Sequence, residues 1–182
     1  RAEGIAGASV TIPFKETVMG LLDSLDEKAA RIGAVNTIIN RKGTLTGCNT
    51  DGPGLISDLT EWFEIRGKTF VVLGAGGAAR AAVFSLREAE AIPVVVNRTP
   101  ERARELAESF GCGWALPAEI GRLQADCLIN TTPLGMVPDT DRTPLEARFL
   151  GRFPRVMDMI YHPLQTRLLR EARDAGCAVR SG

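Results

Sequence analysis

One decapeptide decides the fold: Val71-Val72-Leu73-Gly74-Ala75-Gly76-Gly77-Ala78-Ala79-Arg80. Its apolar start predicts a buried strand, and the strand leads directly into a G-x-G-x-x-A turn and a helix. Gly74 permits the tight turn, Gly76 lets the backbone approach a pyrophosphate, and Ala79 allows close packing of the helix on the sheet. Free N–H groups at the helix start attract a phosphate. The expected cofactor-binding residues of the turn are Gly74, Ala75, Gly76, Gly77 and Ala78.

Strands and helices alternate downstream of this turn. We expect strands at 70–73, 92–97, 127–130 and 156–160, a further strand at the C-terminus, and helices at 76–88, 99–110 and 163–175. Strands that are near-continuous apolar runs, separated by helices, predict a parallel sheet covered on both faces. We therefore expect residues 67–182 to form a doubly wound, Rossmann-like domain.

The residues upstream, 1–66, predict a second and smaller α/β domain. The sequence indicates an apolar-rich run at 4–12, helices at 13–22, 26–32 and 51–63, and extended runs at 35–40 and 44–48 around a turn at Lys42-Gly43. A charged, glycine-containing stretch at 64–68 interrupts the pattern. We place the domain boundary there.

The composition excludes several classes of protein. Of the 182 residues, 45% are hydrophobic and 24% charged, which excludes a disordered chain and a membrane-embedded one. The 22 basic and 22 acidic side chains balance, so no field gathers nucleic acid or an anionic membrane. The four cysteines are scattered and match no metal-ligand spacing, which predicts reduced thiols and no metal site. We expect a cytoplasmic protein.

The tip of the second strand of the Rossmann-like domain predicts which dinucleotide binds. In this fold an acidic residue there selects NAD, whereas an Arg accommodates the 2′-phosphate of NADP. Here the strand ends in Asn97-Arg98-Thr99, Arg102 follows one helical turn later, and no carboxylate is present. Two guanidiniums and a hydroxyl predict a phosphate clamp, and hence NADP. Alternatively, Thr99 caps the next helix, Pro100 occupies its first position and both arginines face water.

Three polar residues near the N-terminus are candidates for catalysis. We expect Lys15 in the first turn of a helix, where the helix dipole disfavours a cation and so favours proton release. Asn36 and Asp51 lie at the edges of apolar runs. From the residues alone, Asn36 also fits a turn and Asp51 a helix cap, and both interpretations stay open.

The chain resembles the shikimate dehydrogenase family. The resemblance rests on motifs that occur in the family's order over almost all of the chain. They are Val10-Thr11-Ile12-Pro13-Phe14-Lys15-Glu16, Ile32-Gly33-Ala34-Val35-Asn36-Thr37, Gly47-Cys48-Asn49-Thr50-Asp51-Gly52, the decapeptide turn, Asn97-Arg98-Thr99, Asn130-Thr131-Thr132-Pro133-Leu134-Gly135-Met136 and Tyr161-His162-Pro163-Leu164-Gln165-Thr166.

The resemblance implies NADPH-dependent reduction of 3-dehydroshikimate to shikimate, a step of aromatic amino acid biosynthesis. It implies that Lys15 is the general acid of the reduction and that Asp51 sets its protonation. It assigns the substrate hydroxyls to Thr11 and Asn36, with Ser9 and Tyr161 also lining the substrate. It places Glu27 near the cofactor, and Thr131, Thr132 and Met159 along the nicotinamide half. His162 matches no family role.

The sequence also departs from the family in three places. A Ser-containing carboxylate-binding motif would precede this region, and a Gly-rich helix start with a substrate-binding Gln would follow it; neither is present. The chain opens at Arg1 rather than Met, which favours a fragment of a longer chain. Ser9 stands where many members have Asn, which resembles members fused to other enzymes of the pathway.

Two alternatives remain at this point. A quinate or quinate/shikimate dehydrogenase would share Lys15 and Asp51 but tends to use NAD, against which Arg98 and Arg102 argue. A ligand-sensing module would keep the fold without turnover. We expect a small-molecule substrate, no nucleic acid or membrane partner, and a monomer or homodimer.

Overall fold

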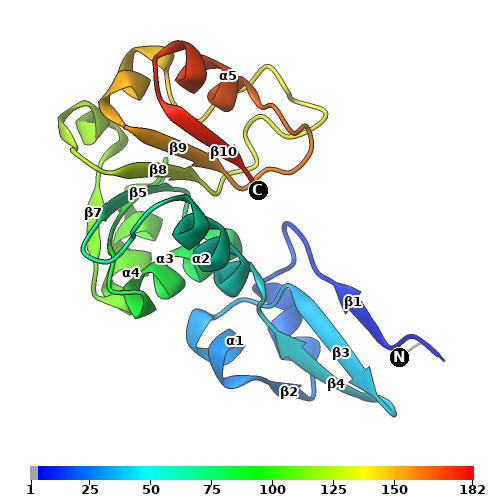
Figure 1. The fold of residues 1–182 in the computed structure, drawn as a ribbon. Coiled ribbons are helices and arrows are strands. Elements are labelled where there is room, and N and C mark those ends of the chain that lie inside the picture. Colours follow the sequence, from blue (N-terminus) through cyan, green and yellow to red (C-terminus); the bar gives the residue numbers. More distant parts are fainter. Residues whose placement is uncertain (1–3) are drawn as a thin grey trace.

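Two separate sheets organise the chain, as the computed structural model of residues 4–182 shows (Figure 1). The first sheet has four strands in the order β1-β3-β4-β2, with antiparallel β1–β3 and β3–β4 pairs. Its elements are β1 (Gly7–Ser9), the 3-10 helix η1 (Thr17–Leu21), β2 (Ser24–Leu25), α1 (Glu27–Ile32), β3 (Thr37–Arg41) and β4 (Thr44–Cys48). The α2 helix (Asp51–Trp62) follows this sheet.

The second sheet has six parallel strands in the order β10-β9-β8-β5-β6-β7. Its elements are β5 (Thr69–Leu73), α3 (Gly77–Glu88), β6 (Ile92–Val96), α4 (Pro100–Phe110), β7 (Gly113–Ala115), η2 (Pro117–Arg122), β8 (Cys127–Asn130), η3 (Ala147–Arg152), β9 (Arg155–Asp158), α5 (Arg167–Asp174) and β10 (Ala178–Ser181). Within this sheet the chain begins at the central strand β5, adds β6 and β7 on one side and then adds β8, β9 and β10 on the other. The strand order therefore reverses between β5 and β8, where doubly wound folds bind their ligands. The expected α/β class and Rossmann-like architecture are confirmed.

Burial on both faces explains why the central strands of this sheet are largely apolar. In β5, Phe70 and Val72 pack with α2, α3 and α4, whereas Val71 and Leu73 pack with α5, η2 and η3. Successive side chains of a strand point to opposite faces, so a strand covered on both sides has few polar positions. This arrangement fixes the carboxyl ends of the strands as one edge, which carries the Gly74 turn.

Two of the expected helices begin later than the sequence indicates. The helix expected over 13–22 is only the short 3-10 helix η1, because the Lys15 carbonyl accepts a hydrogen bond from the Val35 N–H (2.7 Å) and is not available to the following turn. Lys15 therefore does not lie in the first turn of an α-helix. The helix expected from 163 begins at Arg167, since Thr166 caps it by accepting from the Leu169 N–H.

The helices α1 and α2 join the first sheet to the second. The buried face of α2 packs on α3 through Leu55 and Leu59. The C-terminal end of α1 is held by Arg80 on α3, whose Nε donates to the Ile32 carbonyl over 2.6 Å. Figure 1 shows α1 below α2 and α3, beside the β3–β4 hairpin. The two sheets are thus connected along one side, at α3.

Replacing Gly33 by Ala is expected to lower the free energy of unfolding by about 2 kcal/mol, because Gly33 is in the left-handed region, which costs other residues roughly 1–2 kcal/mol. Its added Cβ would also lie 2.7 Å from the Arg80 guanidinium. Gly43→Ala is the matched control, with a φ of +89° and no atom within 4 Å of the added Cβ. Urea unfolding of both variants measures the difference. Equal losses would show that the Arg80 contact contributes nothing.

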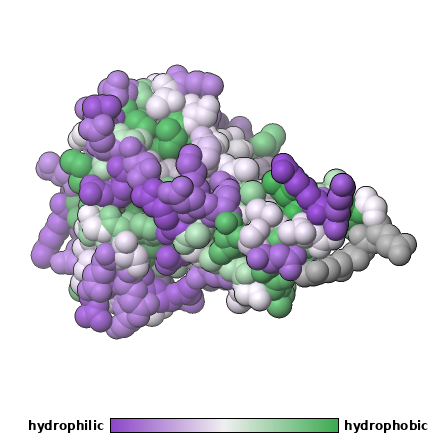
Figure 2. Space-filling view, turned by 90° about the horizontal axis from the view of Figure 1, so that it is seen from below, coloured by the Kyte–Doolittle hydropathy of each residue, from purple (hydrophilic) through white to green (hydrophobic). Residues whose placement is uncertain are grey.

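The surface is mixed in character. On the face shown in Figure 2, hydrophilic residues predominate and hydrophobic ones lie between them. The exposed large hydrophobic side chains include Phe14, Leu21, Tyr161 and Leu164. Within residues 4–182, no helix has the length and apolar character needed to cross a membrane.

Candidate active site

An ion pair between Lys15 and Asp51 lies where the two domains meet. The Lys15 Nζ is 2.6 Å from Asp51 Oδ2, and the side chains are 15% and 19% exposed. Asp51 is the first residue of α2, where the positive end of the helix dipole favours a carboxylate. The pair is partly shielded from water yet remains reachable, as a proton-transferring pair has to be.

Asn36 holds the other oxygen of the Asp51 carboxylate. Its Oδ1 accepts from the Thr50 N–H over 2.9 Å, which leaves Nδ2 to donate to Asp51 Oδ1 over 2.6 Å. Because a backbone N–H can only donate, this contact fixes the orientation of the amide group. Asn36 is therefore neither a simple turn residue nor free to rotate. Asp51 is fixed at both oxygens, by Lys15 and by Asn36.

Gly77 determines how closely Lys15 approaches the dinucleotide turn. A Cβ at Gly77 would lie 2.9 Å from the Lys15 Cβ and 3.3 Å from the Ala34 Cβ. Real Cβ atoms do not approach so closely, so the missing side chain at Gly77 lets the stem of Lys15 lie against the start of α3. The sequence gives Gly77 a role in binding phosphate, and the structure adds this contact with Lys15.

The turn itself has the geometry that the sequence indicates. Gly74 has a φ of +116°, and a Cβ there would lie 2.5 Å from Thr131 Oγ1. Gly76 is the N-cap of α3 and has no atom within 4 Å of its missing Cβ, so a ligand can approach the backbone. Ala79, in the first turn of α3, is fully buried. Ala75, Gly77 and Ala78 are half-buried along the same edge.

Two free guanidiniums lie next to this turn, beyond β6. Arg98 and Arg102 are exposed, and neither makes an ion pair or hydrogen bond with any residue between Gly4 and Gly182. Asn97 Nδ2 donates to the Thr99 carbonyl over 3.0 Å and so shapes the loop. Thr99 is the N-cap of α4, yet its side chain makes no capping hydrogen bond. Thr99 at the N-cap, Pro100 as the first helical residue and both exposed arginines agree with the alternative interpretation, but the Thr99 hydroxyl does not make the capping bond and is available to a ligand.

On the other side of the turn, the loop after β8 carries Thr131 and Thr132. Thr131 Oγ1 donates to the Leu73 carbonyl over 2.6 Å, and Thr132 Oγ1 donates to Asn130 Oδ1 over 2.7 Å. Met159 follows β9 and is half-buried, with its N–H bonded to the Asn130 carbonyl. These three residues thus lie at the carboxyl ends of β8 and β9, beside the switch point of the sheet.

Comparison with known proteins assigns this arrangement to a family. Residues 1–38 match the model of the shikimate dehydrogenase substrate binding domain, and residues 57–126 match that of shikimate / quinate 5-dehydrogenase. A shikimate dehydrogenase (NADP(+)) of Moorella thermoacetica is 47% identical over all of this chain, which spans 66% of that relative. The crystal structure of shikimate 5-dehydrogenase from Thermus thermophilus in complex with NADP(H) and shikimate is 41% identical, with a TM-score of 0.86, and the match covers 99% of this chain and 68% of that one. The chain belongs to the shikimate dehydrogenase family.

A further structural relative is a chorismate mutase/shikimate 5-dehydrogenase fusion protein from Clostridium acetobutylicum, 37% identical with a TM-score of 0.88. It matches 97% of this chain and 65% of its own. Members of the shikimate dehydrogenase family thus occur as parts of longer proteins.

The remaining residues expected for a shikimate dehydrogenase are less tightly placed. Ser9 ends β1 opposite Thr37, and Thr11 follows it, so both run beside Asn36. Tyr161 is 70% exposed and makes no hydrogen bond to Lys15 or Asp51. Glu27 is exposed in the first turn of α1, and no hydrogen bond or ion pair within residues 4–182 joins it to the dinucleotide turn. The backbone pairing places Ser9 and Thr11 beside Asn36, whereas the expected position of Glu27 near the cofactor stays a prediction.

Cysteine and metal chemistry find no support here. All four thiols are free, and burial raises the pKa of each, that of Cys112 to about 11. Neutral thiols are poor nucleophiles near pH 7. Among residues 4–182 no cluster of three or more His, Cys, Asp or Glu side chains could hold a metal ion.

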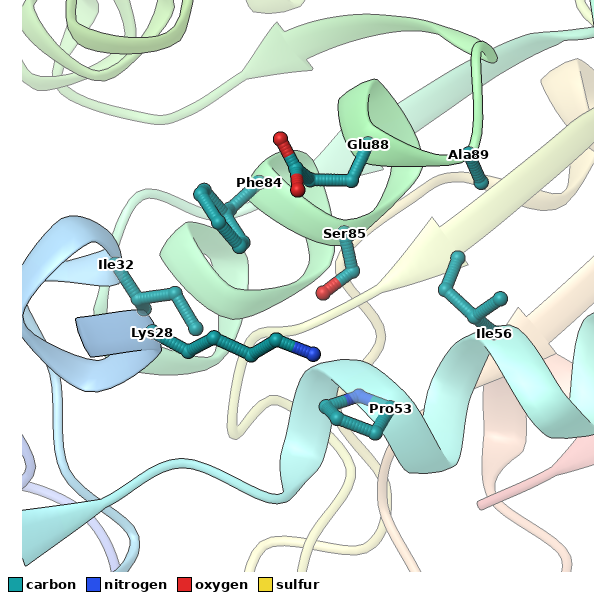
Figure 3. A pocket seen from close by; sticks show the side chains of 8 residues that line it. All are labelled: Lys28, Ile32, Pro53, Ile56, Phe84, Ser85, Glu88 and Ala89. Carbon is teal, nitrogen blue, oxygen red and sulfur yellow. The ribbon is translucent and has the colours of Figure 1, made fainter. Parts of the chain in front are cut away.

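A separate cavity of about 330 Å³ lies between α1, α2 and α3 (Figure 3). Its lining consists of Lys28, Ile32, Pro53, Ile56, Phe84, Ser85, Glu88 and Ala89. The Lys28 ammonium extends into it toward Pro53. None of the expected catalytic or cofactor residues lines this cavity. Lys28 therefore lies outside the candidate active site, although it is only 13 residues from Lys15 in the sequence.

The sequence interpretation missed one buried group, Asp158. It ends β9, is fully buried, and contacts Asn130, Ile160 and Thr166 through hydrogen bonds. A signal was present, since Asn130 and Asp158 are polar residues at the ends of two apolar strands that both lead into the same edge of the sheet.

Proposed function

We propose that this chain catalyses the NADP-dependent interconversion of 3-dehydroshikimate and shikimate in aromatic amino acid biosynthesis. The observation that carries the proposal is the Lys15–Asp51 pair, held at 2.6 Å directly against the dinucleotide turn. The names of the relatives support it, since they are NADP-dependent shikimate dehydrogenases. We place the boundary between the substrate domain, 1–66, and the NADP domain, 67–182.

The residues present fit an NADP molecule. The open approach at Gly76 and the N–H groups of α3 suit a pyrophosphate. Arg98 and Arg102 have no other partner in the described chain and can form the charge-assisted hydrogen bonds that a 2′-phosphate needs. Thr131, Thr132 and Met159 would face the nicotinamide half. When bound, the cofactor supplies or accepts a hydride.

The side chains of the protein handle the proton. When the ketone carbon gains a hydride, its oxygen becomes an alkoxide that needs a proton. The Lys15 ammonium donates this proton, becomes a neutral amine and recovers a proton from water. In the reverse direction the neutral amine takes the proton from the substrate hydroxyl. Asp51 stabilises the charged form of Lys15, and Asn36 keeps Asp51 in the orientation that this requires.

NADP is preferred to NAD because of the free Arg98 and Arg102 at the strand tip. Quinate dehydrogenases tend to use NAD, so shikimate is the preferred substrate. Ser9, Thr11, Asn36 and Tyr161 would contact substrate hydroxyl groups. The cytoplasm is the proposed location, and a monomer or homodimer the proposed assembly.

Initial rates with shikimate or quinate, each with NADP⁺ or NAD⁺, test this proposal. We expect NADP⁺ to be preferred at least tenfold, about 1.4 kcal/mol, and shikimate to be the faster substrate. Faster turnover of quinate with NAD⁺ would assign the chain to quinate oxidation. Tight binding of NADP⁺ and shikimate with no turnover, in a chain that also carries the two family segments not present here, would show a ligand-sensing module instead.

A further inference from the structure

A chain of buried hydrogen bonds links the loop after β8 to the start of α5. Asp158 Oδ1 accepts from Asn130 Nδ2 and from the Ile160 N–H, both over 3.0 Å, and Oδ2 accepts from Thr166 Oγ1 over 2.7 Å. Asn130, Asp158 and Thr166 have no exposed surface. Three elements, β8, β9 and α5, therefore meet at one carboxylate.

The direction of each of these hydrogen bonds is fixed by backbone N–H groups. The Thr132 N–H donates to Asn130 Oδ1 over 2.9 Å, so Asn130 can present only its NH₂ group to Asp158. The Leu169 N–H donates to Thr166 Oγ1 over 3.3 Å, so the Thr166 hydroxyl hydrogen is directed to Asp158. The Asn130 NH₂ group and the Ile160 N–H can only donate, so Asp158 Oδ1 has to accept from both, and Oδ2 accepts from the Thr166 hydroxyl.

A donor does not fit at the position of Asp158 Oδ1. Burial raises the pKa of the Asp158 carboxyl, against the effect of its three donors, and no cation in the described chain pairs with it. Burying a carboxylate costs free energy, which its hydrogen bonds have to offset. What these bonds determine is the position of Asn130 and of the residues on either side of it.

That position matters at the dinucleotide turn. Asn130 Oδ1 receives the hydroxyl and the N–H of Thr132, and the Asn130 carbonyl receives the Met159 N–H. Next to it, Thr131 is bonded to the Leu73 carbonyl and lies where a Cβ on Gly74 would be. Thr131, Thr132 and Met159 are thus set in place through Asn130 before any ligand arrives.

We propose that Asp158 is a positioning residue for the nicotinamide half of the cofactor, acting through Asn130 on Thr131, Thr132 and Met159. The inference rests on the proposed function for the identity of the ligand, but the preformed loop can be tested without it. Asp158 has no part in binding the adenosine half, which would lie across the switch point at Arg98 and Arg102. Loss of Asp158 should therefore weaken binding of the nicotinamide half and leave binding of the adenosine half unchanged.

The test is Asp158→Asn, which keeps the shape of the side chain but replaces the oxygen that accepts from the Thr166 hydroxyl by an NH₂ group. We expect the Kd for NADP⁺ to rise at least about tenfold, and the Kd for adenosine 2′,5′-bisphosphate, a probe of the adenosine half alone, to stay unchanged in calorimetric titrations. In the ligand-free protein, hydrogen exchange at the Thr132 and Leu134 amides should accelerate. An equal loss for both ligands, or unchanged NADP⁺ affinity and exchange, would overturn the proposal.

A second pair of variants covers a failure of Asp158→Asn to fold. Thr166→Val removes the hydroxyl that donates to Asp158 Oδ2, whereas Thr166→Ser keeps it. We expect Val to weaken NADP⁺ binding and speed exchange at Thr132, and Ser to restore both. Equal NADP⁺ affinities and equal exchange rates at Thr132 in the Val and Ser variants would count against a positioning role for Asp158. If the unaltered chain binds no NADP⁺, the proposed function fails, while exchange at Thr132 still decides whether Asp158 positions the loop.

Discussion

Replacing Lys15 by Met is expected to lower the turnover of shikimate with NADP⁺ roughly 10³-fold, within the 10²–10⁴-fold range of general acid–base catalysis. Met has no proton to give, yet its unbranched stem can lie against Gly77 as the Lys15 stem does. Binding of NADP⁺ should therefore stay unchanged while kcat falls. Steady-state kinetics combined with a calorimetric titration of NADP⁺ separates the two effects.

Lys28→Met is the matched control for this substitution. Lys28 lies in α1 and points into the cavity between α1, α2 and α3, whose lining includes neither Lys15 nor Asp51. It loses the same charge and keeps the same stem, so its kcat should equal that of the unaltered chain. A Lys15→Met variant that turns over as fast as Lys28→Met would remove Lys15 from the mechanism.

Replacing Arg98 and Arg102 together by Ala is expected to weaken NADP⁺ binding by about 3 kcal/mol, since each charge-assisted hydrogen bond contributes about 1.5–3 kcal/mol. This corresponds to roughly a 100-fold rise in Kd. NAD⁺ lacks the 2′-phosphate, so its Kd should not change. Titration of both dinucleotides into the double variant measures the preference directly.

Arg104→Ala provides the control for the charge of α4. Arg104 lies on the same helix but pairs with Glu108 at 3.8 Å. Its removal lowers the net charge without touching the strand tip, so the preference for NADP⁺ should persist. A parallel loss of NADP⁺ and NAD⁺ affinity in the Arg98 and Arg102 variant would show that these arginines support the fold of the loop and not a phosphate.

Local sequence patterns were sufficient for the centre of the second domain, because β5 and β8 are buried on both faces and α3 and α4 closely follow β5 and β6. The apolar run of β5 and the glycines after it predict the strand, the turn and α3 within one residue. The two late helix starts were not predicted in this way. Lys15 is engaged by Val35, a partner distant in sequence, and such a contact leaves no local pattern. Thr166 did offer a local signal, since it caps α5 through the Leu169 N–H, but its bond to Asp158 is visible only in the fold.

The candidate site was predicted unevenly, for the same reason. The pairing of Lys15 with Asp51 came from the family motifs, and spacing alone left Asp51 as a possible helix cap. The free arginines followed from the residues at one strand tip, where position determines function. Asp158 was missed because its partners come from β8, β9 and α5, which only the folded sheet brings together.

The absence of a side chain at Gly77 also restricts how the two domains can rotate. Lys15 lies against Gly77, and Arg80 is bonded to Ile32 on the same helix, so α3 carries both contacts. Packed contacts of this kind act as a pivot, because shearing them would force atoms into overlap. Displacement then grows with distance from the pivot. In such a rotation we expect the tip of the β3–β4 hairpin at Lys42 to move far. Lys15, which lies next to the pivot, would move little, so its distance from the dinucleotide turn would stay nearly constant.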